Sequence, residues 1–382
     1  MCNIDLCNEN ECTQCFTCVA VCPQNCITMV PSEAGFSKPA IDRNECIECG
    51  LCMKSCHQKG YSPYLRKAIP QKVYASWSKD NEIRQSSSSG GIFSVFASYI
   101  LKREGVVFGA SFVEDLRLRH VAVADVSELK KLRGSKYLQS DLSGCYEEVK
   151  GYLQLDKYVL FTGTPCQIAG LYAFLKKDYA KLYTCDVICH GVPSQAAFDL
   201  YCKKINLSLS NCVDFEFRYL KGWGYQLSYN DISIPVSDCY YMNAFSKGYM
   251  FMESCYKCPY AKLERISDIT MADFWGIGTK QLFRYSKSKG VSMLLVNTKK
   301  GKELLNNCLN ELFLEERSVE EAVSGNFNLT HSSIRPKERN CYFSDSLVLS
   351  KQELVNKYDL QPSIRDYLRP IKRKIQSLLW KF

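Results

Sequence analysis

Residues 157–194 read KYVLFTGTPCQIAGLYAFLKKDYAKLYTCDVICHGVPS, and this stretch organises the interpretation of the whole chain. The apolar run from Tyr158 to Phe161 predicts a buried strand, and the apolar spacing from Ile168 to Lys176 predicts a helix. A second apolar segment then ends in the tripeptide CHG at 189–191. Each strand end delivers a cysteine into a glycine-containing turn, which favours a ligand site, because glycine permits close backbone approach and helix N-termini bind anions. The alternative is a βαβ unit with two buried thiols.

Length and composition indicate a soluble protein of several domains. The chain has 382 residues, of which 46% are hydrophobic and 23% charged. This length allows about two or three domains. No apolar run approaches the ~20 residues that span a bilayer, and no basic-then-apolar leader opens the chain. We therefore expect a cytoplasmic location, where thiols stay reduced.

Cysteine is abundant and unevenly distributed. The chain has 22 cysteines, and eleven of them lie within the first 56 residues. In a reducing compartment this usage predicts metal binding rather than disulfides. The net charge of +9 would ordinarily suggest nucleic acid. However, a 4Fe–4S centre with four thiolates carries roughly −2, so three centres would offset most of the excess. Since the basic residues are scattered and no nucleic-acid motif is present, we expect no nucleic-acid partner.

The N-terminal head repeats one cysteine spacing 34 residues further along the chain. The two copies are Cys12, Cys15, Cys18, Cys22 and Cys46, Cys49, Cys52, Cys56. In such a repeat three thiolates on a tight loop hold one cubane, and the fourth reaches the other cubane. We therefore assign one cluster to Cys12, Cys15, Cys18 and Cys56, and the other to Cys46, Cys49, Cys52 and Cys22. The alternative, structural zinc, prefers paired knuckles.

This head resembles a bacterial two-cluster ferredoxin over residues 1–60. One departure from the pattern is His57, which stands where proline is usual. It removes no ligand. We interpret the off-pattern Cys2, Cys7 and Cys26 as plain thiols. The following residues, Gly60 to Pro70, predict a linker.

Two polar loops in the middle of the chain are candidate binding sites. Residues 84–91 read RQSSSSGG and precede an amphipathic helix, so Ser89, Gly90 and Gly91 are expected to contact a phosphate or a flavin edge. Residues 134–140 read GSKYLQS, with Lys136 as the only cation. The alternatives are a flexible linker for the first loop and a polar loop with a solvated lysine for the second. Strands are predicted at 72–78, 106–112 and 120–126, with His120 as a satisfied core histidine.

The segments SSSSGG, GSKYLQS, GTPCQIAG and CHGVPS, in this order, resemble the beta subunit of deazaflavin-coenzyme-reducing hydrogenases and dehydrogenases. That family includes relatives fused to a ferredoxin head, such as a plant chlorophyll-derivative reductase. The resemblance runs from about residue 72 to 280. It implies FAD, at least one further 4Fe–4S centre and electron transfer between them. The implied flavin contacts are Ser89, Gly90, Gly91, Lys136, Tyr137, Gln139, Ser140, Thr162, Gly163, Thr164 and Gln167.

A third cluster is also implied by the resemblance. The chain carries Cys255 and Cys258 in a CxxC motif, which alone would also suit half a zinc knuckle, but no second CxxC lies downstream. The residues that match the family's following segment are Arg265, Asp268, Asp273 and Trp275. We assign the third centre to Cys166, Cys189, Cys255 and Cys258, with Cys185 as the alternative to Cys189. The cysteines expected only to pack are Cys145, Cys202, Cys212, Cys239, Cys308 and Cys341.

The last third of the chain carries weaker signals. A strand is predicted at 291–296 and a helix at 301–314. Residues 364–382 are basic with helical apolar spacing. They predict either a helix that caps its own domain or a weak contact with a membrane surface or a partner.

We predict an α+β protein in which a small two-cluster head precedes a mixed α/β flavin domain. The expected parts are the head at 1–60, the flavin domain at 72–155 and 156–330, and a helical tail at 331–382. The expected function is an oxidoreductase that passes electrons between 4Fe–4S clusters and FAD for an unidentified small substrate. We expect a redox partner protein or a small electron donor or acceptor, and the sequence names no catalytic residue. The alternatives are a non-catalytic electron carrier and a transferase with Cys166 as nucleophile and His190 as base.

Overall fold

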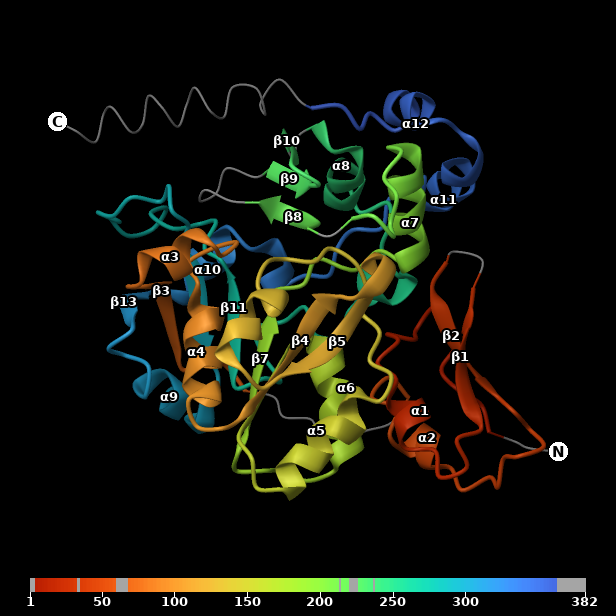
Figure 1. Ribbon diagram of the computed structural model, residues 1–382, viewed down its shortest axis with the longest axis horizontal. Helices are drawn as coiled ribbons and strands as arrows, with labels where there is room; N and C mark the ends of the chain where they lie inside the picture. Colours follow the sequence, from red (N-terminus) through yellow and green to blue (C-terminus); the bar gives the residue numbers. More distant parts are fainter. Residues whose placement is uncertain are drawn as a thin grey trace.

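The computed structural model describes residues 4–32, 35–59, 68–212, 214–219, 226–235 and 238–362. A large mixed sheet with covering helices forms the body, and a small head packs at one side (Figure 1). The predicted α+β class is confirmed. Most of the expected linker at 60–70 and the predicted helix at 364–382 lie outside the described residues. Within the described part of the chain, no helix has the length and apolar character needed to cross a membrane.

The large sheet has eight strands in the order β13-β3-β12-β11-β7-β6-β4-β5. Their bounds are β3 Lys72–Ser78, β4 Val106–Phe112, β5 Leu118–Val123, β6 Val159–Gly163, β7 Leu182–Val187, β11 Ile269–Asp273, β12 Ser292–Val296 and β13 Leu312–Arg317. The four central strands β11, β7, β6 and β4 run parallel, and the outer pairs are antiparallel. The carboxyl ends of the parallel strands therefore meet at one edge, which is where ligands bind in such sheets.

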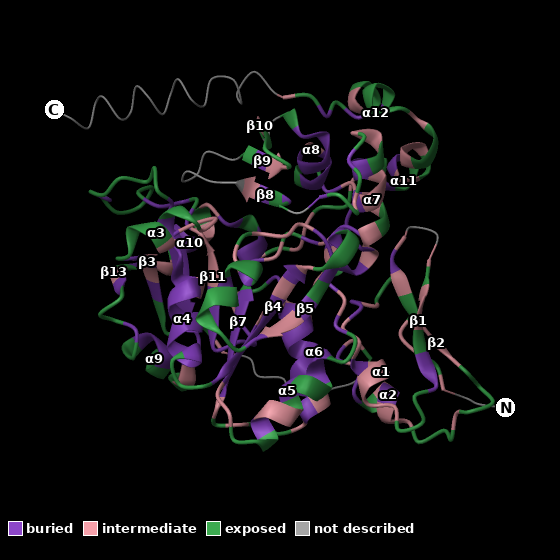
Figure 2. Ribbon diagram, viewed as in Figure 1, coloured by how far each residue is buried: buried purple, intermediate pink, exposed green. Residues whose placement is uncertain are grey.

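Helices cover both faces of this sheet because side chains alternate along each strand. On one face, α4 (Ile92–Leu101) and α9 (Lys299–Asn306) pack against Val107 and Leu160. On the other face, α5 (Cys145–Gln154) and α6 (Pro165–Leu175) pack against Phe108 and Phe161. The central strands, α4 and α6 are accordingly among the most buried elements (Figure 2). The short helices α3 (Asn81–Gln85) and α10 (Val319–Ser324) lie near the β3 edge (Figure 1).

A second group of elements surrounds an aromatic core beyond the carboxyl edge (Figure 1). It comprises the strands β8 Glu216–Tyr219, β9 Gln226–Tyr229 and β10 Ile232–Pro235, and the helices α7 Gln195–Lys204, α8 Tyr240–Ser246, α11 Arg339–Val348 and α12 Lys351–Lys357. Phe198 and Tyr241 lie at its centre, and Tyr342 and Leu354 from the last two helices join the same core. The last two described helices therefore pack with residues from the middle of the chain.

The head contains α1 (Thr17–Ala20), α2 (Leu51–Lys54) and an antiparallel pair, β1 (Ile27–Pro31) and β2 (Ser37–Ile41). It docks on α5 and α6. Thr17 Oγ1 donates a hydrogen bond to the Gly170 carbonyl at 3.0 Å. Gly170 permits this approach, since a Cβ there would lie 2.9 Å from Cys15 Cβ.

Sequence periodicity located most elements of the body. The strands at 72–78 and 106–112 have the predicted bounds, whereas β5 begins and ends a few residues earlier than expected. The helix predicted at 301–314 is wrong in its second half, because α9 ends at Asn306 and Leu312–Arg317 is strand β13. Pairing of this segment with β3 along its full length overrides the helical spacing.

Candidate functional site

Two cavities in the head gather the eight repeated cysteines. The first is lined by Cys12, Cys15, Cys18 and Cys56. The second is lined by Cys22, Cys46, Cys49 and Cys52, and Cys52 borders the first as well. The structure thus brings together the two sets that the repeat predicts, each with its fourth member from the other copy. Thiols around a hollow fit the donor set of two cubanes.

Two further head cysteines lie beside these sets, although their spacing gave no sign of it. Cys7 borders the first cavity, and its pKa is raised to about 12, first by a hydrogen bond with Cys12. Cys26 borders the second cavity, with its Sγ 3.4 Å from Cys22 Sγ. Their interpretation as plain thiols stays a prediction, as does that of Cys2, which lies outside the described residues.

A third set of cysteines gathers at the carboxyl edge of the large sheet. Cys166 lies in the first turn of α6 directly after β6, and Cys189 lies two residues beyond β7. Cys255 lies within the short helix η4 (Glu253–Lys257) and Cys258 follows it. Burial raises the pKa of Cys166 well above its ordinary value, and the charges of the other three thiolates raise it further. Four thiols that converge in this way fit the donor set of a cubane, whose cationic core would favour their thiolate forms.

Cys185, the alternative ligand, is placed elsewhere. It lies within β7 opposite Ile269 and Thr162 and is fully buried in the core. The charges that raise its pKa after burial come from Asp268, Asp186 and Cys308 rather than from the third set. The remaining cysteines expected to pack are buried at Cys145, Cys202, Cys212, Cys239 and Cys308, whereas Cys341 is exposed.

Across the described ranges, no three histidine, cysteine or acidic side chains converge as ligands of a single metal ion do. In a cubane each thiolate binds a different iron atom, so its ligands stand farther apart than those around one ion. This observation therefore concerns single-ion sites only.

Arg265 supplies a buried positive charge beside the third set. Its guanidinium pairs with Asp186 at 2.9 Å and donates to the Tyr260 carbonyl at 3.0 Å. Its charge lowers the pKa of Cys189 and Cys258, which burial raises. A fixed cation here favours the thiolate form that metal binding needs.

The serine- and glycine-rich loop has the features of a polar ligand seat. Ser89 Oγ is buried and has no hydrogen-bond partner among the described residues. Gly90 permits close packing, because a Cβ there would lie 2.4 Å from the Ser76 carbonyl oxygen. Gly91 has φ +83°, and α4 begins directly after it. An orphan hydroxyl next to a helix N-terminus fits a phosphate or flavin edge.

This loop is connected to the carboxyl edge near the third set. Arg218 donates to the Ser88 carbonyl at 2.6 Å and pairs with Asp273, the last residue of β11, at 2.7 Å. Burial lowers the pKa of His190, and the charge of Asp273 opposes this shift. Because His190 follows Cys189, Asp273 is the acidic group that links the surroundings of the third set to the serine loop.

The loop at 134–140 makes contacts within the protein. Lys136 Nζ donates to the Arg133 carbonyl at 2.6 Å, and burial lowers the pKa of Lys136 to about 7. The Tyr137 ring packs against aromatic rings of the second core. Gln139 donates to the Gln14 carbonyl of the head at 3.3 Å. Of the expected flavin contacts on this loop, Gln139 thus faces the head.

Several other expected flavin contacts form one hydrogen-bonded chain. Gln167 Nε2 donates to Ser140 Oγ at 2.8 Å, and Ser140 Oγ bonds His120 Nδ1 at 2.8 Å. His120 Nε2 bonds the Thr162 carbonyl at 2.9 Å, and the Thr164 N–H donates to Gln167 Oε1 at 2.9 Å. Gly163 adjoins this chain, as a Cβ there would lie 2.9 Å from Gln167 Oε1. The interpretation of His120 as a satisfied core histidine agrees with this geometry.

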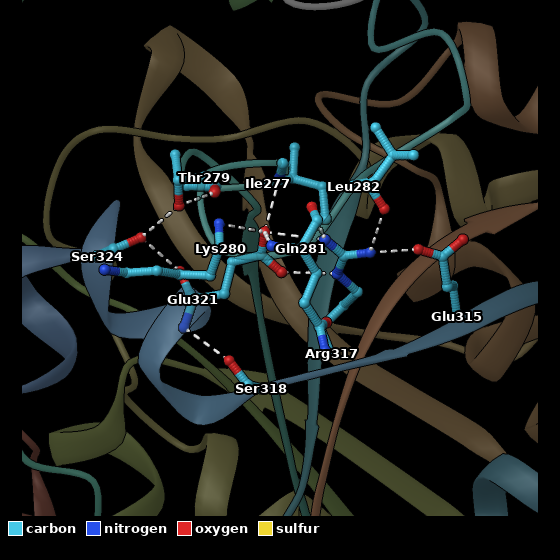
Figure 3. A network of polar contacts seen from close by, with 12 residues as sticks. Ile277, Thr279, Lys280, Gln281, Leu282, Glu315, Arg317, Ser318, Glu321 and Ser324 are labelled. Carbon is cyan, nitrogen blue, oxygen red and sulfur yellow. Dashed lines mark hydrogen bonds and ion pairs between the residues drawn. The ribbon is translucent and has the colours of Figure 1, made fainter.

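Sequence reasoning missed the support of the loop that follows β11 (Figure 3). Glu321 accepts a hydrogen bond from the Gly278 N–H at 2.8 Å, and Arg317 donates to the Gln281 carbonyl at 2.7 Å. Arg317 and Glu321 are also paired with each other at 2.6 Å. The network fixes the segment after Trp275, and the only signal for it is the i,i+4 spacing of the two charges.

Three family models match the chain. "Coenzyme F420 hydrogenase/dehydrogenase, beta subunit N-term" matches residues 73–145, and the corresponding C-terminus model matches residues 156–322. "4Fe-4S dicluster domain" matches residues 11–59. The two beta-subunit models together cover more than half of the chain. No curated protein matches it.

One similar solved structure is the F420-reducing NiFe hydrogenase complex from Methanosarcina barkeri. The two chains are 19% identical, the match covers 77% of this chain and 94% of that one, and the TM-score is 0.47. The family assignment rests on the models above. The chain belongs to the coenzyme F420 hydrogenase/dehydrogenase beta-subunit family, carries an N-terminal 4Fe–4S dicluster domain, and is an iron–sulfur redox protein.

Proposed function

We propose that this protein is an iron–sulfur flavoprotein oxidoreductase, which passes electrons between ferredoxin-type clusters and FAD to reduce or oxidise a small substrate or coenzyme. One set of contacts carries the proposal. Ser254, next to Cys255 of the third set, donates to the Cys12 carbonyl of the head at 3.0 Å. Asp273 acts on His190, the neighbour of Cys189, and is linked by Arg218 to the serine loop.

The residues proposed to hold FAD are those of the serine loop and of the two loops at 134–140 and 162–167. When bound, FAD converts one-electron steps into two-electron chemistry, including hydride transfer. Ser89 would donate or accept a hydrogen bond that it lacks within the protein. The hydrogen-bonded chain through His120 would keep the 162–167 turn rigid. Lys136 would place a cation near the site.

The proposed clusters are the two head sets and the third set of Cys166, Cys189, Cys255 and Cys258. Arg265 would partly offset their negative charge, since it lies beside Cys189 and Cys258. The proposal includes the domain ranges given above, a cytoplasmic location and a redox partner or small electron donor. Coenzyme F420, which the family description names, is the first compound to assay as substrate.

Anaerobic purification followed by turnover assays on the isolated chain tests this function. We expect FAD to be released on denaturation and the chain alone to couple a one-electron reductant or oxidant to a two-electron substrate. A protein with full clusters and flavin that turns over only when a separate reductase is added would favour the electron-carrier alternative. A colourless apoprotein with full activity would favour the Cys166 nucleophile and overturn the proposal.

A further inference from the structure

His57, which replaces the usual proline after the last head cysteine, bridges the head and the body. Its ring is buried between two hydroxyl groups. Tyr260 Oη lies 2.6 Å from His57 Nδ1, and Thr13 Oγ1 lies 3.1 Å from His57 Nε2. Both hydroxyl groups can donate or accept, so either neutral tautomer of the ring makes both hydrogen bonds, one as donor and one as acceptor. The His57 and Tyr260 ring centroids are 5.5 Å apart.

The positions of these residues in the sequence connect two cysteine sets. His57 follows Cys56 and Thr13 follows Cys12, both members of the first head set. Tyr260 lies two residues after Cys258 of the third set. The Tyr260 hydroxyl contacts His57, the neighbour of Cys56, so Tyr260 connects the first head set with the third set.

Two further contacts join the same sets. Ser254 Oγ donates to the Cys12 carbonyl at 3.0 Å, and Ser254 directly precedes Cys255. Gly170, which lies on the same helix as Cys166, approaches Cys15 so closely that a Cβ would stand 2.9 Å from Cys15 Cβ. The first head set therefore faces the third set across several direct contacts.

The second head set faces away from this junction. The residues that line its cavity all belong to the head, between Ile4 and Cys52. Cys49 is exposed, and the neighbouring Ile47 is 60% exposed. Glu45 and Glu48 on the same loop are exposed as well. Through Cys49 this set therefore reaches the surface, where an external electron donor or acceptor can approach it.

We propose that Thr13, His57 and Tyr260 form the electron junction between the head and the body, an inference that rests on the proposed function. The first head set, which contains Cys12, is then the inner centre, and the second head set, which contains Cys46, is the outer centre. Electron tunnelling slows steeply with the gap between centres, and hydrogen bonds shorten the effective path. One electron crosses at a time. One centre is oxidised as the next is reduced, no bond is made or broken, and a one-electron reductant at the outer set supplies the electron.

The first test removes one hydroxyl from the junction. Tyr260→Phe keeps the ring but deletes the hydrogen bond to His57. Tyr358→Phe is the matched control. It deletes the 2.5 Å hydrogen bond from the Tyr358 hydroxyl to Asp345, which is not part of the head. Both are mixed anaerobically with reduced ferredoxin, and head and flavin absorbance are followed separately. In Tyr260→Phe we expect head reduction at the normal rate and flavin reduction about tenfold slower, which corresponds to about 1.4 kcal/mol in the barrier. Iron and flavin contents should equal those of the control.

Equal flavin reduction rates in the two variants, with full iron and flavin, would overturn the junction and leave the proposed function standing. A wild-type protein with only about eight irons, or without flavin, would overturn both, because the third set would then hold no cluster. These outcomes are distinguished by the iron and flavin assays on the same samples.

The second test assigns the inner and outer centres. Reduced clusters that lie close together broaden each other's electron paramagnetic resonance signals. Cys15→Ser should abolish the broadening of the third centre's signal, whereas Cys49→Ser should leave it in place. Loss of broadening in Cys49→Ser alone would overturn the assignment. About eight remaining irons in each variant, together with the unaltered signal of the intact head centre, show that the head is folded.

Discussion

The head and the carboxyl edge of the sheet both collect cysteines, but they do so by different means. The head builds its two sets from one short spacing used twice within 45 residues, from 12 to 56. In the third set, Cys166 and Cys189 come together because β6 and β7 are adjacent parallel strands, and the 255–258 motif joins them where the Met252 N–H donates to the Val192 carbonyl at 3.0 Å. Local spacing can therefore be interpreted without a fold, whereas a set assembled by strand order requires one.

The largest expected effect breaks the third set without touching the head. Cys166→Ser and Cys258→Ser should each lose about a third of the iron, from about twelve to about eight atoms. The head ligands all lie before residue 57, so the head spectrum should survive. Cys185→Ser and Cys145→Ser are matched controls, because both thiols are buried away from the set, and should keep all the iron. Unchanged iron in both Cys166→Ser and Cys258→Ser would refute the ligand assignment.

The next effect concerns the charge that supports the third set. Arg265→Met leaves Asp186 buried without its cation, which should lower the free energy of unfolding by about 3–5 kcal/mol. Arg117→Met breaks an exposed pair with Asp199 and should cost no more than about 1 kcal/mol. Denaturant unfolding of both apoproteins makes the comparison. Equal losses would show that Arg265 contributes no more than a surface charge.

Acid should destabilise the body through His120. Burial lowers the pKa of His120 to about 4, whereas an unfolded histidine titrates near 6.5. The unfolded chain therefore binds a proton that the folded chain does not, and stability falls as pH falls from about 6.5 to about 4. The free energy of unfolding should fall by about 1.4 kcal/mol for each pH unit, to a total loss of about 3 kcal/mol. His120→Gln lacks this titration. Between about pH 6.5 and 4 the free energy of unfolding of the wild type should therefore fall more than that of the variant. Parallel pH profiles in the two proteins would contradict it.

The smallest effect concerns Lys136 and the proposed flavin. An ammonium close to a reduced, anionic flavin favours the reduced form by ~1–2 kcal/mol. Since ~1.4 kcal/mol is ~30 mV for a two-electron couple, Lys136→Ala should lower the flavin midpoint by some tens of millivolts. Lys136→Arg should restore most of it. The difference should shrink as pH rises through about 7, where the buried Lys136 loses its charge. If redox titrations give the same flavin midpoint for the wild type, Lys136→Ala and Lys136→Arg, then Lys136 does not stabilise the reduced flavin.

Much of the fold followed from local patterns. The residue patterns in 72–78 and 106–112 predicted two strands with the observed bounds, because each pairs with neighbours along its length. The helix prediction for 301–314 was wrong in its second half, because that part forms a strand by pairing with β3, which lies more than 200 residues away in the chain. The His57–Tyr260 bridge had no local signal for the same reason, as its partners are 203 residues apart.

The candidate sites show the same limit. The spacing of the head cysteines predicted two groups, and the members of each group line one of two cavities. In contrast, spacing alone left Cys185 and Cys189 equivalent, because the sequence predicted that both flank one strand. Only the register of β7 shows that Cys185 points into the core while Cys189 lies beyond the strand end.

Total iron per chain in the anaerobically prepared wild-type protein tests the central claim most directly. Three centres predict about twelve irons, with three distinguishable signals in the reduced protein. About eight irons, with both head centres shown by spectroscopy to be fully occupied, would contradict a third centre at the edge of the sheet.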